Sequence, residues 1–390
     1  MRQLVPKLHE LKAFQQPEWE DAAQVRRVRE ALSSLPPLVT ADAVAELRSL
    51  LAEVAAGRAL VLQAGDCAED PAESSPADVR RKSALLDRLA DILGEATGKP
   101  ALRVGRIGGQ FAKPRSERFE QVGGLALPVF RGHMVNAPEP DPQRRRPDPE
   151  RMLTCYRAAD DIVRELDRRN TARPRAGKVW TSHEALLLDY EVPMVREAGD
   201  GSRWLGSAHW PWIGERTRQT DGAHVRLLAD VVNPVGCKIG PGTTPAEVTA
   251  LCEQLDPGRD PGRLTLISRM GAHVLADRLP PLVRAVQAAG HPVIWLCDPM
   301  HGNTITAPDG NKTRLLQSML VELRSFLRVM AVTGGVAGGL HLETTPDEVT
   351  ECVADISALG SVGDRHTTFC DPRLNPGQAV ALVSAWSDSL

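Results

Sequence analysis

The segment Leu264–Thr304, LTLISRMGAHVLADRLPPLVRAVQAAGHPVIWLCDPMHGNT, contains one complete repeating unit of the predicted fold. An apolar, β-rich run stops at Arg269, and a second such run stops at an acid, a proline and a histidine. Between them, residues 274–290 place apolar side chains at helical spacing, with Gly290 suited to a helix end. Pro280 and Pro281 predict that this helix kinks or divides into two short helices. Strand, helix and strand in this order predict two parallel strands with a helical crossover.

The same order of elements recurs along the chain. Eight β-rich runs stop at polar or glycine-rich residues, ending at Cys67, Gly109, Ala185, Trp210, Gly240, Gly271, His301 and Thr344. Eight such units predict an α/β protein with a closed (β/α)8 TIM barrel. Two amphipathic patterns, at residues 20–35 and 41–57, precede the first run. We therefore expect an N-terminal helical extension at residues 1–57, packed on a catalytic barrel at residues 58–390.

Composition excludes several classes of function. The 390 residues are 42% hydrophobic, and 47 Lys and Arg against 50 Asp and Glu give a net charge of -3. This balance gives no electrostatic reason to expect a nucleic acid or an anionic membrane as partner. The N-terminal sequence MRQLVPKLHELKAF has no signal-like apolar core, and no segment approaches the roughly 20 apolar residues of a membrane span. We expect a cytoplasmic protein.

Barrel enzymes carry their active sites at the C-terminal ends of the strands. The polar residues at the ends of the runs should therefore share one mouth; they are Cys67, Arg106, His183, Glu184, His209, Lys238, Arg269, His301 and Glu343. Cys67, His301 and Glu343, with Asp371 from FCDPRLNPG, suit a divalent transition metal such as manganese, iron, cobalt or zinc. Each of these residues taken alone is also explained as an ordinary buried residue. Cys67, His301 and Glu343, however, stand at the ends of strands one, seven and eight, which adjoin in a closed barrel, and together they favour a metal site.

A second group of strand-end residues is cationic. Its members are Arg106, Lys238 and Arg269, joined by Lys113, Arg115 and Arg216. Cations that converge on one mouth repel each other unless anions are present, which predicts phosphate-rich substrates. The alternative for each is a structural ion pair with Glu184, Glu215 or Asp298. A metal that can polarise a carbonyl beside such a pocket indicates aldol-type bond formation between phosphorylated compounds.

These residues stand in a set of ordered motifs that covers the chain from about Gln16 to the C-terminus. The motifs are LQAGDCAE, RIGGQFAKPRS, RGHMVN, TSHEALLLDYE, WIGERTRQTDGAH, NPVGCKIGP, LTLISRMG, DPMHGNT, GGLHLE and CDPRLNPGQ. The sequence closely resembles the type II family of 3-deoxy-D-arabino-heptulosonate 7-phosphate (DAHP) synthases. The resemblance implies a metal-dependent condensation of phosphoenolpyruvate with erythrose 4-phosphate that releases inorganic phosphate.

The resemblance also implies a role for each site residue. A divalent ion, expected to be Mn²⁺ with Co²⁺ or another transition metal as alternatives, would be held by Cys67, His301, Glu343 and Asp371. Phosphoenolpyruvate would contact Arg106, Glu215, Arg216, Lys238 and Arg269, the sugar phosphate would contact Lys113, Arg115 and Ser116, and Trp212 would form a wall. The expected catalytic residues are Lys238, Glu215 and Arg106, the first two for the protons of an added water. Asp298 is expected to orient His301 or a lysine.

Departures from the family pattern leave alternatives open. The stretch AEDPAESSP after Cys67 is unusually acidic, and about 57 residues precede the first strand. The extra helices that carry feedback sites in this family are expected to be absent. This favours a weakly regulated short form, similar to those of phenazine and other secondary-metabolite pathways. An aminated analogue of erythrose 4-phosphate, or an inactive regulatory partner of a chorismate mutase, are the other interpretations. The resemblance suggests a homodimer.

Overall fold

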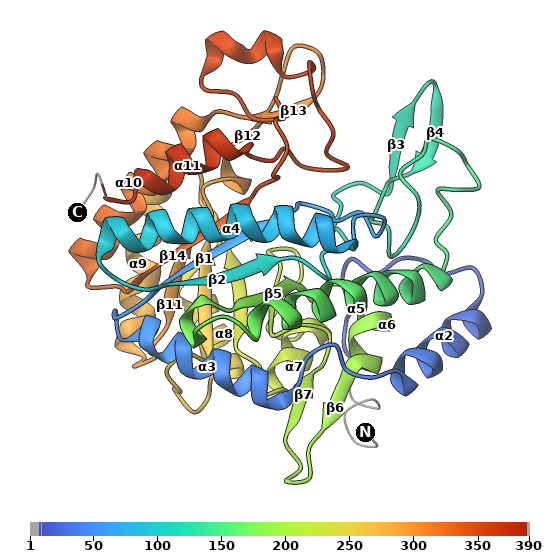
Figure 1. Ribbon diagram of the computed structural model, residues 1–390, viewed down its shortest axis with the longest axis horizontal. Coiled ribbons are helices and arrows are strands. Elements are labelled where there is room, and N and C mark those ends of the chain that lie inside the picture. The colour runs from blue at the N-terminus through green and yellow to red at the C-terminus, as the bar shows by residue number, and fades with distance from the viewer. Residues whose placement is uncertain (1–7, 9, 388–390) are drawn as a thin grey trace.

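The computed structural model describes residue 8 and residues 10–387, and eight parallel strands close into a barrel at its centre (Figure 1). The strands are β1 (Leu60–Gly65), β2 (Ala101–Arg106), β5 (Val179–Glu184), β8 (Trp210–Ile213), β9 (Val235–Ile239), β10 (Leu264–Ser268), β11 (Ile294–Cys297) and β14 (Ala337–Glu343). Strand β1 closes the barrel between β14 and β2, with Gly65 level with Glu343 and Arg106. A Cβ at Gly65 would lie 2.6 Å from the Arg106 carbonyl oxygen, so only glycine fits there. The predicted TIM barrel is confirmed.

Helical segments follow the barrel strands in turn. They are α4 (Pro76–Thr97), α5 (Glu150–Asn170), α6 (Leu188–Glu191), α7 (Ala223–Ala229), α8 (Pro245–Leu255), α9 (Leu275–Ala288), α10 (Leu316–Thr333) and α11 (Pro376–Ser384). Helix α9 runs through Pro280 and Pro281 without a break, so the alternative of two short helices is wrong. Burial of Leu279, Leu282 and Val283 against the barrel offsets the backbone hydrogen bonds that the prolines cannot make.

Two helices precede β1 along the chain. They are α2 (Ala22–Ser34) and α3 (Ala41–Ala55). Leu51 and Val54 of α3 are fully buried in a cluster that includes Trp210 and Ile294, at the first positions of β8 and β11. Helix α3 therefore closes the N-terminal end of the barrel and leaves the C-terminal end for chemistry. The division into residues 1–57 and 58–390 stays a prediction.

Three hairpins interrupt the regular order, and the sequence patterns did not predict them. They pair β3 (Phe119–Val122) with β4 (Leu125–Pro128), β6 (Val195–Glu197) with β7 (Arg203–Leu205), and β12 (Thr304–Thr306) with β13 (Lys312–Arg314). The first two project from the body of the molecule (Figure 1). The run assigned to the fourth strand consists of β7 and the turn that follows it, and the barrel strand begins only at Trp210.

His209 is therefore misplaced by the sequence prediction. It precedes β8 and lies at the N-terminal end of the barrel, so its predicted place at the mouth is wrong. Its Nδ1 accepts a hydrogen bond from the Thr181 backbone N–H at 3.1 Å. Burial lowers the pKa of His209 to about 3, which keeps the ring neutral.

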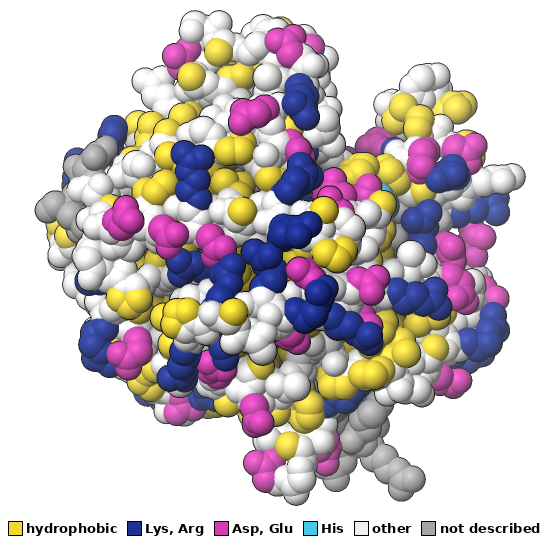
Figure 2. Space-filling view, viewed as in Figure 1, with side chains coloured by type: hydrophobic (Ala, Val, Ile, Leu, Met, Phe, Trp, Pro, Cys, Tyr) yellow, Lys and Arg dark blue, Asp and Glu magenta, His cyan; other side chains and the backbone are white. Residues whose placement is uncertain are grey.

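The surface agrees with the balanced composition. Figure 2 shows basic and acidic side chains interspersed over the visible face, and neither sign occupies it alone. Within residues 8 and 10–387, none of the helices combines the length and the apolar character that crossing a membrane requires.

Candidate metal centre and anion pocket

The four predicted metal ligands lie at the C-terminal end of the barrel, and three of them form one close group. Cys67 follows β1, Glu343 ends β14, His301 opens a short 3-10 segment after β11, and Asp371 precedes α11. One donor atom each from Cys67, Glu343 and Asp371 lies within 4.8 Å of the others. His301 Nε2 is 3.3 Å from Glu343 Oε1. The structure thus groups a thiol and two carboxylates, and it places an imidazole beside one of these carboxylates.

The surroundings of this cluster fit a divalent ion. Burial opposes ionisation of Glu343, but His301, Lys113 and Arg314 outweigh it and hold its pKa well below the ordinary value. Burial, the neighbouring Cys370 thiol and Glu343 raise the pKa of Cys67 well above its usual range. A thiol in this position becomes a thiolate ligand when a metal supplies positive charge beside it. A mixed sulfur, nitrogen and oxygen set suits transition metals of intermediate softness.

Asp298 orients both His301 and Lys238, in agreement with the prediction. This fully buried carboxylate lies 2.7 Å from His301 Nδ1 and 3.0 Å from Lys238 Nζ. Burial opposes its ionisation, but the charges of His301 and Lys238 hold the pKa of Asp298 well below the ordinary value. With Nδ1 engaged, Nε2 of His301 is the nitrogen left to face the metal cluster.

A cavity of about 190 Å³ lies beside the metal cluster. Its lining residues are Arg106, Gln110, Lys113, Pro114, Glu184, Trp212, Gly214, Glu215, Arg216, Lys238, Arg269, His301 and Asp371. Five of the six predicted cations face this one space, so the structure brings them together. Trp212, which was predicted to form a wall, lines the same cavity, and its ring lies 5.2 Å from the Arg106 guanidinium carbon.

Arg106 is fixed by three contacts and still has donors to spare. Its Nη2 donates to Glu343 Oε1 at 2.9 Å, its Nε to the Asp66 carbonyl at 3.0 Å, and its Nη1 lies 2.7 Å from His341 Nε2. A guanidinium has five N–H groups, so two remain for a ligand.

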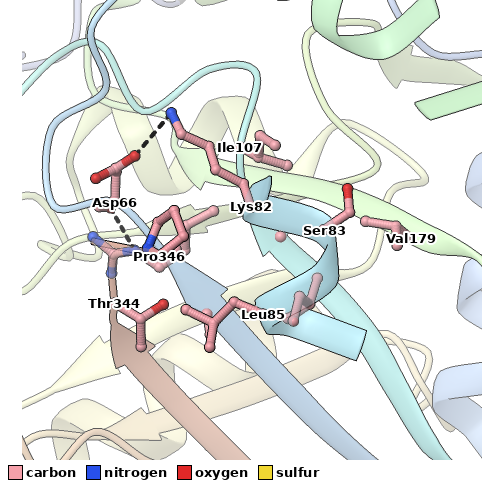
Figure 3. A pocket seen from close by; sticks show the side chains of 13 residues that line it. Asp66, Lys82, Ser83, Leu85, Ile107, Val179, Thr344 and Pro346 are labelled. Atoms are coloured by element: carbon pink, nitrogen blue, oxygen red, sulfur yellow. Dashed lines mark hydrogen bonds and ion pairs between the residues drawn. The ribbon is translucent and has the colours of Figure 1, made fainter. Parts of the chain in front are cut away.

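The Asp66 side chain is held by Lys82, whose Nζ lies 3.0 Å from Asp66 Oδ2 (Figure 3). The cavity in that figure measures about 20 Å³, room for about one water molecule, and is too small for a substrate.

The segment after β8 contributes a carboxylate, Glu215, and a guanidinium, Arg216. Glu215 Oε1 accepts from Arg218 at 3.0 Å, whereas its buried Oε2 has no hydrogen-bond partner among the described residues. Arg216 Nη2 donates to Ser116 Oγ at 2.8 Å. Arg269 donates to the His301 carbonyl at 3.2 Å, which joins the cation set to the metal-cluster loop. A buried carboxylate oxygen without a partner is free to accept a proton or a hydrogen bond from a ligand.

The predicted sugar-phosphate residues divide between two spaces. Lys113 Nζ is 3.6 Å from Glu343 Oε1 and 3.7 Å from Asp371 Oδ2, so it lies at the metal cluster. Arg115 and Ser116 instead line an adjoining cavity of about 350 Å³. Three residues of extended backbone span at most about 10 Å, so one short chain could reach both.

Sequence reasoning missed two buried carboxylates that hold the loops of the site. Glu69 accepts the backbone N–H groups at positions 108, 109 and 110, all within 2.8 Å, at the start of the loop that carries Lys113. Glu322 on α10 accepts those of Met270 and Gly271, beside Arg269. Glu69 lies in the quoted motif LQAGDCAE, which was a usable signal. Glu322 follows the helical pattern of α10 and offered none.

Strand alternation separates His183 and Glu184, which were both predicted to face the mouth at the third strand end. Glu184 lines the cavity, whereas His183 points away from it and lies 2.8 Å from Glu191. Successive side chains of a strand face opposite sides, so only one of the pair can reach the mouth.

Comparisons with known proteins agree with the geometry. A family model described as the Class-II DAHP synthetase family matches residues 5–171 and 163–386. A Pseudomonas fluorescens protein named "Probable phospho-2-dehydro-3-deoxyheptonate aldolase" is 52% identical over 389 residues, covering 99% of this chain and 97% of that protein. A Streptomyces coelicolor protein named "Phospho-2-dehydro-3-deoxyheptonate aldolase" is 39% identical, covering 96% of this chain and 94% of that protein.

A solved structure shows a similar fold. It is a phospho-2-dehydro-3-deoxyheptonate aldolase from Francisella tularensis SCHU S4, with a TM-score of 0.56 and 12% identity. The alignment covers 95% of this chain and 97% of that one. At this identity the likeness shows the fold alone.

Proposed function

Because the chain belongs to the class-II DAHP synthetase family, we propose that it condenses phosphoenolpyruvate with erythrose 4-phosphate to give DAHP and inorganic phosphate. The observation that carries this proposal is a group of three metal-ligand types, with His301 beside Glu343, next to a cavity lined by five cations. Phosphorylated substrates would neutralise the charges of the clustered cations. The aldehyde would supply the carbonyl that a Lewis-acidic metal polarises.

Cys67, His301, Glu343 and Asp371 would hold a divalent ion, which when bound supplies Lewis acidity toward an aldehyde oxygen. Mn²⁺ is our proposed ion, with Co²⁺ or another transition metal as alternatives. Asp298 keeps His301 in the orientation that this binding needs.

Phosphoenolpyruvate would occupy the cavity of about 190 Å³. Arg106, Arg216 and Arg269 offer forked donors for its phosphate and carboxylate, and Lys238 offers a compact charge. The flat face of Trp212 would confine the enol carbon on one side. Lys113 would meet the second substrate where the cavity adjoins the metal cluster.

The reaction follows from this placement. Carbon 3 of phosphoenolpyruvate attacks the aldehyde carbon, a carbon–carbon bond forms, and the aldehyde oxygen takes a proton. Positive charge develops at carbon 2, where Glu215 is the candidate to stabilise it, since its Oε2 has no other partner in the described chain. Water adds to carbon 2, and one of its protons passes to Glu215 or Lys238 and replaces the proton that the aldehyde oxygen has taken. The carbon–oxygen bond to phosphate then breaks, the carbon 2 hydroxyl gives its proton to the phosphate as the ketone forms, and inorganic phosphate leaves.

Several finer points belong to the same proposal. We propose an enzyme without tight feedback by aromatic amino acids, serving phenazine or another secondary-metabolite pathway. We also propose a cytoplasmic location. A homodimer is the proposed assembly, with docking to a chorismate mutase as a less favoured addition.

The test is product identification. Purified protein with Mn²⁺, phosphoenolpyruvate and erythrose 4-phosphate should give DAHP in the mass spectrum and one phosphate per phosphoenolpyruvate consumed. Product from an aminated erythrose 4-phosphate analogue alone would favour the aminoDAHP alternative. Metal binding without product from either aldehyde would favour the inactive regulatory partner.

A further inference from the structure

A network of three buried polar side chains, Gln63, Ser182 and His341, joins the backbone of β2 to Arg106 inside the barrel; we call it the Gln63 network. Ser182 Oγ donates to the Gly105 carbonyl at 2.9 Å, and Gln63 Nε2 donates to Ser182 Oγ at 3.1 Å. Gln63 Oε1 lies 2.6 Å from His341 Nδ1, and His341 Nε2 lies 2.7 Å from Arg106 Nη1. The network therefore leaves β2 at Gly105, passes through β5, β1 and β14, and returns to β2 at the next residue.

The donors and acceptors of the Gln63 network fit one arrangement of protons. The single hydroxyl proton of Ser182 goes to the Gly105 carbonyl, so this hydroxyl can only accept from Gln63. The amide nitrogen of Gln63 therefore faces Ser182, and the amide oxygen faces His341 Nδ1, which must carry a proton. Because a guanidinium only donates, His341 Nε2 carries no proton and accepts from Arg106. The ring of His341 is thus a neutral acceptor in one fixed tautomer.

Strand register and ring packing hold this imidazole in place. Gln63 and His341 are level with each other in the parallel pair of β1 and β14. The rings of His341 and Trp212 meet edge to face, with centroids 5.1 Å apart and planes at 90°. Gln63, Ser182 and His341 are fully buried, at positions that barrels fill mainly with branched apolar side chains. Buried polar groups cost stability unless they are partnered, and each of the atoms named above has its partner.

A neutral acceptor suits Arg106 better than a second carboxylate would. Glu343 Oε1 already lies 2.9 Å from Arg106 Nη2 and offsets part of the guanidinium charge. A second anion would cancel the charge that a phosphate or carboxylate of a substrate needs, and it would compete for the same donors. His341 instead engages one N–H of Nη1 and restrains the guanidinium plane without adding charge.

We propose that His341 and Gln63 are positioning residues of Arg106, with the identity of the bound anion resting on the proposed function. Gln63 sets the tautomer of His341, and His341 holds the guanidinium so that its two remaining N–H groups are available to phosphoenolpyruvate. Arg106 lines the cavity of about 190 Å³, whereas Gln63 and His341 lie outside its lining. They act on the substrate through Arg106 alone.

Calorimetry with phosphoenolpyruvate tests the proposal. His341→Phe keeps a planar ring against Trp212 but removes the acceptor, so the Kd should rise about 10- to 100-fold, the value of one hydrogen bond to a charged group. His341→Gln, which again offers a neutral acceptor, should recover part of this loss. Gln63→Met keeps the length of the side chain and removes the amide, and it should raise the Kd about 3- to 10-fold.

The matched control is His209→Phe. His209 is also buried and also meets a tryptophan edge to face, since its ring centroid lies 5.1 Å from that of Trp180, but it lies at the opposite end of the barrel. This variant should leave the Kd within about twofold. Unchanged binding in both His341→Phe and Gln63→Met, or an equal loss in His209→Phe, overturns the proposal.

Nitrogen NMR of protein with ¹⁵N-labelled histidine reads the tautomer directly. The resonances of His341 are those that His341→Phe removes. We expect a protonated Nδ1 and an unprotonated Nε2 in the wild type, and a change in this pattern in Gln63→Met, which a merely space-filling Gln63 would not cause. A protonated Nε2 in the wild type overturns the proposal.

Catalysis and binding can fail separately. If the wild type binds phosphoenolpyruvate but makes no DAHP, the proposed function fails, and the comparison of Kd values still decides about His341 and Gln63. If the wild type does not bind phosphoenolpyruvate, both the proposed function and the role of these two residues are overturned.

Discussion

Replacing Asp298 by asparagine should destabilise the protein strongly, because Asp298 is the partner of the buried Lys238. The carboxylate is fully buried, lies 3.0 Å from Lys238 Nζ and 2.7 Å from His301 Nδ1, and accepts the backbone N–H groups of Met300 and His301. Asparagine keeps the size but removes the charge. Lys238, itself buried, is left without a carboxylate, and breaking a buried pair in this way costs about 3–5 kcal/mol.

A double-mutant cycle isolates the interaction. Lys238→Met leaves Asp298 with His301 and two backbone donors, so we expect a smaller loss of about 1–3 kcal/mol. In the double variant the unpaired charge is gone, so the combined loss should fall short of the sum by about 2–3 kcal/mol.

Urea unfolding without added metal provides the free energies. The control is Asp230→Asn, which breaks a surface pair with Arg226 at 3.2 Å and should cost less than about 1 kcal/mol. A loss below about 1 kcal/mol for Asp298→Asn, or strict additivity in the cycle, would refute the assignment of Asp298 as the ionic partner of Lys238.

Three further predictions concern the loops of the site. Glu69→Gln replaces a carboxylate that accepts three backbone N–H groups, and it should lower the free energy of unfolding in urea by about 1–3 kcal/mol. Gly109→Ala places a Cβ against the His183 ring and should cost a similar amount, whereas Gly242→Ala, with open space around it, should leave the urea midpoint unchanged. Burial raises the pKa of Glu322 from 4.5 to about 7, so the native state binds more protons than the unfolded state between these pH values. The wild type should lose about 3 kcal/mol of stability as pH rises through this window, and unfolding of Glu322→Gln, measured across the same range, should lack that loss.

The sequence predicted the barrel because its signals are local. Strand, turn and helix follow one another, and in a closed barrel the C-terminal strand ends must meet. That rule predicted that Cys67, His301 and Glu343 lie together, and the structure groups Cys67 and Glu343 with Asp371 and places His301 Nε2 3.3 Å from Glu343. The same reasoning also placed five cations in one cavity.

The failures arose where a local pattern had two explanations. The run before Trp210 has the composition of a strand but forms half of a hairpin, which moved His209 to the wrong end of the barrel. Listing His183 with Glu184 ignored strand alternation, which turns only Glu184 inward. Contacts between residues far apart in the chain leave no periodic pattern in the sequence. Arg131, for example, donates a hydrogen bond to the carbonyl of Gln15, which is 116 residues away. Such pairs are set by how loops pack, which periodicity does not encode.

The central claim is that the condensation depends on an ion held by Cys67, His301, Glu343 and Asp371. The most direct measurement is a titration of chelator-treated protein with Mn²⁺, following bound metal and DAHP formation in the same samples. The account predicts no turnover without metal, a rise in proportion to bound Mn²⁺ that saturates at one ion per chain, and loss of both signals in Cys67→Ser. Full turnover in chelator, or one tightly bound ion with no turnover, would contradict it.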